Sequence, residues 1–176
     1  KAQNPYALNE FVIDGKILPE HPGDAFRKGN FNPVTLVSGS NRDEGRFFVA
    51  VSEHLKGKTP TDETYPQWIE QQFGQQLAAA VMKEYPVSAS TDAVEAFSAA
   101  ATDSMFSCPG RAMHSAISAT SPVYAYEFSD RTAPSYIRPT TFPLLAAHTF
   151  ELAYVFPGFH GGSDAKIMLN PLQAEL

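Results

Sequence analysis

Two residues of this sequence, Glu44 and His148, have side chains that can work together in catalysis. Glu44 follows an apolar segment and a polar turn, while His148 lies much later, between two apolar runs. A carboxylate that accepts a hydrogen bond from an imidazole orients the ring and stabilises its charged form, which makes the imidazole a general base. Each residue also has a purely structural interpretation. Glu44 alone is an acid in the first turn of a helix, where the helix dipole favours it, and His148 alone is a packed histidine. Taken together, the two residues predict an acid and base pair that activates a nucleophile.

Other motifs that carry chemistry are incomplete in this sequence. Residues 57–59 (Gly-Lys-Thr) resemble the end of a phosphate-binding loop, but Ser52 stands where the leading glycine belongs. His148 and Glu151 lack the second histidine of a zinc motif, and the histidines show no ligand spacing with the single cysteine. The nearest approach to G-x-S-x-G, residues 161–165, lies in a glycine-rich loop. We therefore expect no metal or cofactor, and no nucleophilic serine within this chain.

The elements around Glu44 and His148 predict an α/β arrangement. Residues 33–38 are a short, β-branched and apolar run before a glycine, which predicts a buried strand. A polar turn with Glu44 follows, and apolar residues from 47 to 55 predict a short helix. In α/β proteins such turns at the carboxyl ends of strands carry functional side chains. Residues 122–128 predict the strongest strand, and a loop then leads to His148.

Residues 61–121 predict a helical region. We expect Thr64 to cap its first helix and Gly74 to end it. Leu77, Val81 and Met82 continue an amphipathic face up to Tyr85-Pro86. Ser90 is expected to cap the helix after that, and Pro109-Gly110 to break the helical run.

The two ends of the chain are less regular. Closely spaced turn signals make residues 1–32 mostly irregular, with one brief extended piece at 11–13. Residues 169–176 resemble the start of a helix.

Composition limits the classes of partner. Apolar residues make up 43% and charged residues 18%, which predicts a folded chain. The net charge of −6 argues against nucleic acid or an anionic membrane surface as partner. No apolar run approaches the roughly 18 residues needed to span a bilayer. Neither nucleic acid nor a membrane is therefore the expected partner.

Five segments of the chain resemble, in the same order, segments of one enzyme family. Residues 39–45 have the form G-x-N-x-x-E-G of type-B carboxylesterases, the group that includes cholinesterases and bacterial para-nitrobenzyl esterases. The other four patterns are DG-x-x-L-P-x-x-P, D-x-x-F-x-C-P-x-R, P-V-Y-x-Y-x-F and H-x-x-E-L-x-Y-V-F, at residues 14–22, 103–111, 122–128 and 148–156. One motif alone would be weak, but five in order over nearly the whole chain are specific.

The resemblance implies a role for each matched residue. Glu44 matches the acid and His148 the base of a Ser-His-Glu triad. Phe47 and Phe48 match aromatic residues that line the substrate gorge, with core packing as the alternative for each, and Phe150 is assigned to substrate contact beside them.

Three further residues match supporting positions of the family. Glu151 matches a buried acid behind the histidine loop, and Asp103 a buried aspartate that orders the region near the site. Cys108 matches a position that is disulfide-bonded in animal members. Here we expect a free buried thiol or a partner beyond Leu176.

The same resemblance implies that residues 1–176 are the carboxyl-terminal part of a single α/β-hydrolase catalytic domain, a few sheet strands with a helical insertion. The nucleophile would lie in an amino-terminal part that this chain lacks, and that part would be its partner, with a small-molecule ester as substrate. One alternative is a cholinesterase-like adhesion or binding protein without activity, and another is a separate product that binds a ligand by itself. The presence of both Glu44 and His148 favours the enzyme. The family favours a secreted or periplasmic location.

Overall fold

The computed structural model describes residues 12–156, 158–161 and 167–175. The chain divides into two compact units, one of Lys1–Val37 with Arg111–Tyr124 and the other of Ser38–Gly110 with Ala125–Leu176. Phe11 of the expected extended piece and the glycine-rich residues 162–166 lie outside the described residues.

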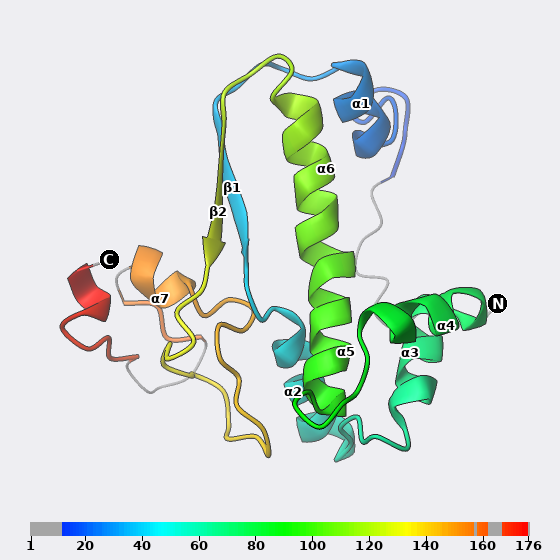
Figure 1. The fold of residues 1–176 in the computed structure, drawn as a ribbon. Coiled ribbons are helices and arrows are strands. Elements are labelled where there is room, and N and C mark those ends of the chain that lie inside the picture. The colour runs from blue at the N-terminus through cyan, green and yellow to red at the C-terminus, as the bar shows by residue number, and fades with distance from the viewer. Residues whose placement is uncertain (1–11, 157, 162–166, 176) are drawn as a thin grey trace. The chain divides into compact units, whose positions relative to one another are not determined.

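The two strands pair side by side in parallel (Figure 1). They are β1 (Leu36–Asn41) and β2 (Val123–Phe128). Backbone hydrogen bonds join the strands at both ends, 3.0 Å long from the Leu36 amide and 2.9 Å long from the Arg42 amide. The strand predicted at 122–128 is therefore confirmed.

The first strand differs from its prediction in both extent and burial. It begins at Leu36 and continues through Gly39, and Val37 is 69% exposed. Gly39 belongs to the strand because the backbone of β2 passes too close for a side chain. A Cβ atom at this position would lie 2.2 Å from the Tyr126 carbonyl oxygen. Gly39, which the sequence pattern marks as the end of the strand, is thus required inside it.

Helices are the main regular elements of the larger unit, and four of them follow the predicted apolar periodicity. A π-helical turn, η1 (Asp103–Ser107), joins the last of these to α6 (Cys108–Ile117). The four are α2 (Gly45–Lys56), α3 (Tyr65–Phe73), α4 (Gln75–Glu84) and α5 (Ala93–Thr102).

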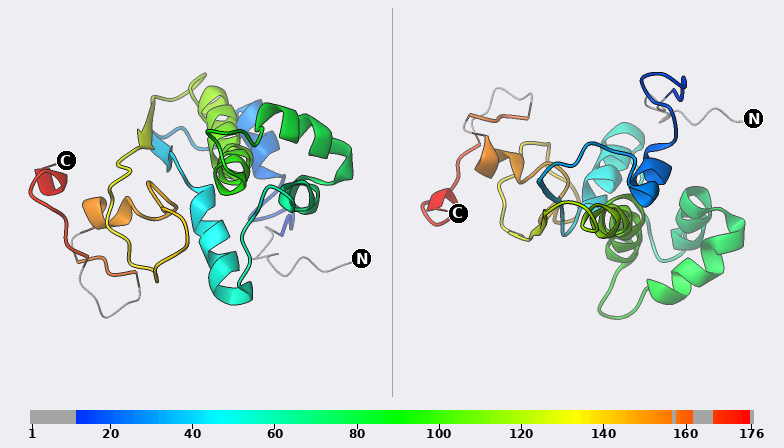
Figure 2. Two further views of the ribbon diagram at one scale, coloured as in Figure 1. Left: turned by 60° about the horizontal axis from the view of Figure 1, so that its bottom comes forward. Right: turned by 90° about the horizontal axis from the view of Figure 1, so that it is seen from above.

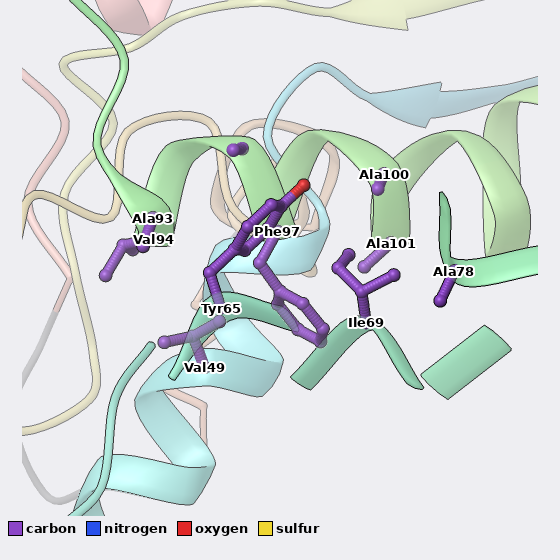
Figure 3. Close-up of a cluster of buried hydrophobic side chains, with 10 residues drawn as sticks. Val49, Tyr65, Ile69, Ala78, Ala93, Val94, Phe97, Ala100 and Ala101 are labelled. Atoms are coloured by element: carbon purple, nitrogen blue, oxygen red, sulfur yellow. The ribbon is translucent and has the colours of Figure 1, made fainter. Parts of the chain in front are cut away.

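The core of the larger unit lies between these four helices (Figure 3). Side chains from α2, α3 and α4 point toward one face of α5, which carries small residues around one large ring. Small residues allow helices to approach closely, so α5 contacts both α2 and α3. The cluster consists of Val49, Tyr65, Ile69, Ala78, Ala93, Val94, Ala96, Phe97, Ala100 and Ala101.

Two predicted helix caps differ from the structure. Asp92, not Ser90, is the N-cap of α5, because its carboxylate accepts a hydrogen bond of 2.8 Å from the Glu95 amide. Thr64 occupies the N-cap position of α3, but its hydroxyl accepts from the Thr61 amide (2.9 Å) and makes no capping bond.

The break predicted at Pro109-Gly110 is wrong. Residues 93–117 are helical without interruption, through the π turn and into α6. Pro109 is the second residue of α6 and comes directly after the π turn, whose wider i→i−5 spacing replaces the α-helical hydrogen bonding where a proline cannot donate. The Cys108 amide instead closes the π turn on the Asp103 carbonyl.

The smaller unit contains a helix in the stretch predicted to be irregular. Helix α1 (Pro22–Lys28) follows His21, whose ring nitrogen accepts from the Gly23 amide (3.1 Å), and ends at Gly29 with φ 75°. Pro22 at the first helical position and a glycine after the last are signals of a helix. Here they resemble a series of turns because the helix is only seven residues long.

Two short elements complete the described chain. They are α7 (Leu152–Val155) and the 3₁₀ turn η2 (Gln173–Glu175), which stands where the start of a longer helix was expected. No helix among the described residues has the length and apolar character to cross a lipid bilayer.

Gly45→Ala is expected to destabilise the protein by about 2 kcal/mol, as overpacked core substitutions do. A Cβ atom there would lie 2.2 Å from the Ser98 carbonyl oxygen, where α2 contacts α5. Thermal unfolding measures the loss. Gly23→Ala is the matched control, because the nearest atoms to its new methyl group are side-chain atoms, of the His21 ring at 3.3 Å and of Arg27 at 3.7 Å. Equal unfolding midpoints for the two variants would show that this close approach does not matter.

Candidate functional site

Glu44 lies in the chain between β1 and α2. Figure 2 shows the cyan helix α2 following directly after strand β1. It is the N-cap residue of α2, has helical backbone angles and makes no capping hydrogen bond with its side chain. Instead the side chain turns inward, and the residue is 4% exposed. The simple reading of Glu44 as a surface acid that compensates the helix dipole is therefore not supported.

His148 lies on a tightly held loop. Its neighbours Ala146 and Ala147 are fully buried, and Leu145 and Thr149 have positive φ angles of 58° and 70°. Positive φ is unfavourable for residues other than glycine, so surrounding contacts must maintain this conformation. Such strain is often found at functional sites.

The turn before Glu44 supplies several of these contacts. The Asp43 amide donates to the Ala146 carbonyl (3.0 Å), and the Asn41 side chain donates to the Ala147 carbonyl (2.8 Å). Asn41 also donates to the carboxylate of Glu151. The same short segment therefore carries the acid and fixes the loop of the histidine.

The structure brings Glu44 and His148 into direct contact. The Nδ1 atom of His148 lies 2.6 Å from Glu44 Oε2, and Oε1 accepts from the Asn41 amide at 2.7 Å. An ionised carboxylate only accepts, so Nδ1–H donates and Nε2 of the neutral ring is left as the acceptor. Among the residues that the structure describes, no hydrogen bond reaches Nε2. The predicted contact is confirmed, and the catalytic roles remain predictions.

Three aromatic rings surround the imidazole. Phe47 and Phe48 lie with their ring centroids 5.6 and 5.4 Å from that of His148, as the sequence led us to expect of residues at the site. Phe106 approaches closer, at 5.1 Å, and stacks on Phe48 at 6.0 Å. The sequence patterns assign no role to Phe106. It belongs to one of the matched patterns, but only the fold shows that it reaches His148.

Phe150 does not lie with these rings. It is 1% exposed and packs against Tyr136, with 5.6 Å between ring centroids. A side chain so buried cannot contact a ligand unless the loop moves, so this placement argues for packing beneath the histidine loop. The loop reverses between His148 and Phe150 at Thr149, and the positive φ of Thr149 is the physical reason for the difference.

The supporting residues are partly buried. Glu151, expected to be a buried acid behind the histidine loop, is half-buried and accepts a hydrogen bond from the Asn41 side chain. Asp103 accepts a hydrogen bond of 2.6 Å from the Tyr85 hydroxyl. Cys108 is exposed and begins α6, whereas a free buried thiol or a partner beyond Leu176 was expected.

Two arginines stabilise the polar turn that precedes Glu44. Arg131 donates two hydrogen bonds of 3.1 Å to the carboxylate of Asp43, and Arg46 donates to the Pro143 carbonyl (2.9 Å). Burial lowers the pKa of Arg46, and the charge of Asp43 opposes this change. These side chains line a pocket of about 200 Å³ that includes neither Glu44 nor His148. We read this cluster as support for the turn.

No group of three or more His, Cys, Asp or Glu side chains within the described ranges is arranged to hold a metal ion. The acid, the base and the aromatic rings are thus the chemical groups that the site offers.

Comparisons with known proteins point to one family. A sequence model described as the carboxylesterase family matches residues 1–170. Para-nitrobenzyl esterase of Bacillus subtilis (strain 168) is 31% identical over 151 residues, which cover 85% of this chain and 28% of that protein. Fumonisin B1 esterase of Sphingopyxis macrogoltabida is 30% identical over 146 residues, which cover 82% of this chain and 25% of that protein.

A solved structure agrees with these relatives. One PNB esterase structure matches with a TM-score of 0.56 and 29% identity, over 85% of this chain and 29% of that chain. This likeness confirms the predicted fold class, part of an α/β-hydrolase. The chain spans less than a third of the length of each of these three proteins.

Proposed function

The chain belongs to the carboxylesterase family, and from this membership we propose that it is the carboxyl-terminal part of the catalytic domain of a serine carboxylesterase. It would contribute Glu44 and His148 to a Ser-His-Glu triad, and the serine would come from the rest of the domain. The single observation that carries the proposal is the 2.6 Å contact between the buried carboxylate and the imidazole. "Full-length protein" below means the chain together with that remaining part.

In this mechanism the serine hydroxyl attacks the carbonyl carbon of an ester while Nε2 of His148 accepts its proton. The imidazolium then gives the proton to the leaving alcohol, and an acyl-enzyme remains. Water attacks the acyl group in the same way, again with His148 as the base, and releases the carboxylic acid and the free serine. Throughout the cycle Glu44 holds the ring at Nδ1 and stabilises its positive charge.

The surroundings of His148 also favour a class of ester. Phe47, Phe48 and Phe106 present aromatic surface around the ring from which the proton moves. Apolar acyl or alcohol groups would lose water on entering such a site, which makes their binding favourable. We therefore propose esters with apolar groups, including aryl esters, as substrates.

Glu44→Gln in the full-length protein tests the proposal. We expect kcat to fall on the order of 10²-fold, with KM nearly unchanged, because an amide cannot stabilise the imidazolium as a carboxylate does. Steady-state hydrolysis of para-nitrophenyl acetate measures both constants. Glu70→Gln, the same chemical change at an exposed position of α3, is the control. Equal kcat for both variants would remove Glu44 from the triad.

The alternative of an inactive, cholinesterase-like binding protein is decided by the same assay. Such a protein would hydrolyse no ester before any substitution is made. Activity in the full-length protein that Glu44→Gln reduces would exclude this alternative.

A further inference from the structure

We propose that Phe106 is a positioning residue for His148, and that the π turn η1 holds its ring against the imidazole. The inference rests on the proposed function, because it concerns how the general base of that mechanism is kept in place. It adds a residue to which the sequence assigned no role.

The hydrogen bond to Glu44 leaves one rotation of the imidazole ring unrestricted. A single hydrogen bond at Nδ1 fixes that atom, but the ring can still swing about the bond. Nε2 is on the opposite side of the ring from Glu44, so a small swing displaces the atom that must take the proton. A misplacement of about 1 Å can cost on the order of 10²-fold in rate. Contacts with the faces and edges of the ring must therefore supply the remaining restraint.

Phe106 is the aromatic contact that comes from a different element. Phe47 and Phe48 are adjacent residues of α2, the helix that begins next to Glu44. Phe106 belongs to η1, and its ring is the closest of the three to His148, at 5.1 Å and an interplanar angle of 45°. It also stacks on Phe48 with an interplanar angle of 26°. The imidazole is thus held between two elements.

The backbone around Phe106 has an uncommon conformation. The Cys108 amide bonds to the Asp103 carbonyl, five residues back, so this turn contains one residue more than an α-helical turn. Well under 1% of residues adopt π-helix, and single π turns occur frequently at functional sites. The additional residue widens the turn, so the side chains within it point in other directions than they would in an α-helical turn.

Hydrogen bonds anchor the start of this turn on two sides. The Tyr85 hydroxyl donates to Asp103 at 2.6 Å, and the Tyr65 hydroxyl donates to the Tyr85 carbonyl at 2.6 Å. Thr102, directly before the turn, accepts from the Gly45 amide at 2.9 Å. The position of the turn is therefore linked to the residue next to Glu44.

The hydrogen bond from Tyr85 to Asp103 persists over the pH range in which ester hydrolysis is measured. Burial, together with the hydrogen bond to Asp103 and the charge of that carboxylate, raises the pKa of Tyr85 well above its ordinary value. The hydroxyl therefore stays protonated and continues to donate to Asp103.

The test compares variants of the full-length protein at and beside this position. Phe106→Leu keeps apolar bulk but removes the aromatic ring, and Phe106→Tyr keeps the ring. Met105→Leu is the matched control, because Met105 lies in the same turn and is 43% exposed. Two readouts are measured: kcat and KM for para-nitrophenyl acetate, and the ring ¹⁵N resonances of His148 in protein labelled with [ring-¹⁵N]histidine, assigned with His148→Ala.

Phe106→Leu is expected to lower kcat about tenfold with KM within about twofold, and to shift or broaden the His148 ring resonances. Phe106→Tyr should restore both readouts to within about twofold of the wild type, and Met105→Leu should change neither. Wild-type kcat and unchanged resonances in Phe106→Leu would overturn the proposal. A rise in KM alone would also overturn it, since Phe106 would then only bind substrate.

A second variant separates positioning from folding. Tyr85→Phe removes the hydroxyl that anchors Asp103 but keeps the ring, and should lower kcat about threefold and perturb the same resonances. If Phe106→Leu does not fold, kcat and the His148 ring resonances of Tyr85→Phe decide whether the π turn positions His148. If the wild-type protein hydrolyses no ester, the proposed function fails, and the ¹⁵N comparison alone still tests whether Phe106 holds the imidazole.

Discussion

His148→Ala is expected to lower the turnover of a short-chain aryl ester by at least about 10³-fold in the full-length protein, because the general base is lost. The effect should exceed that of Glu44→Gln, since His148 transfers the proton while Glu44 only holds and stabilises the ring. Binding of the ester should change little, as the imidazole acts on the serine and not on the substrate's apolar groups.

Steady-state kinetics with para-nitrophenyl acetate measure this loss. His54→Ala is the control, because it removes an imidazole of α2 whose Nε2 forms a hydrogen bond with the Pro139 carbonyl (3.2 Å) and not with Glu44. Turnover of His148→Ala within tenfold of the wild type would eliminate the proposed mechanism, whatever the control shows.

Residues 1–176 by themselves are expected to show no ester hydrolysis above that of the same chain with His148→Ala. Glu44 and His148 can prepare a nucleophile, but the sequence offers neither a serine on a nucleophile elbow nor the expected oxyanion donors. This predicted effect is the largest, because residues 1–176 alone should not hydrolyse the ester at all.

The same chain is also expected to self-associate. Its two strands pair only with each other in the described structure, and large apolar side chains on them are exposed: Val37 at 69%, Tyr124 at 63% and Tyr126 at 51%. Unpaired strand edges and exposed apolar surface promote association. Sedimentation beside the hydrolysis assay provides the measurement. A soluble, cooperatively unfolding monomer with multiple-turnover hydrolysis would show that either the boundaries or the nucleophile has been misread.

The sequence by itself determined the helices and the strand that follow local patterns, and the pairing of Glu44 with His148. Apolar periodicity predicted the helices that became α2, α3, α4 and α5, and the apolar run at 122–128 predicted β2. These patterns are local, since each depends on which face of one element is apolar. The pairing of Glu44 with His148 was predicted from the order of acid and histidine and from the matched motifs, and the two side chains are indeed in contact.

Only the tertiary structure decided how neighbouring elements shape the site. Gly39 reads as the end of a strand until the close approach of β2 is known, and Pro109 reads as a helix break until the π turn before it is seen. Phe106 and Phe150 are both phenylalanines in matched motifs, yet one contacts His148 and the other is buried against Tyr136. Their directions depend on an additional residue in a helical turn and on a positive φ angle at Thr149. Contacts between residues far apart in the chain maintain both conformations, so no local pattern of residue types reveals them.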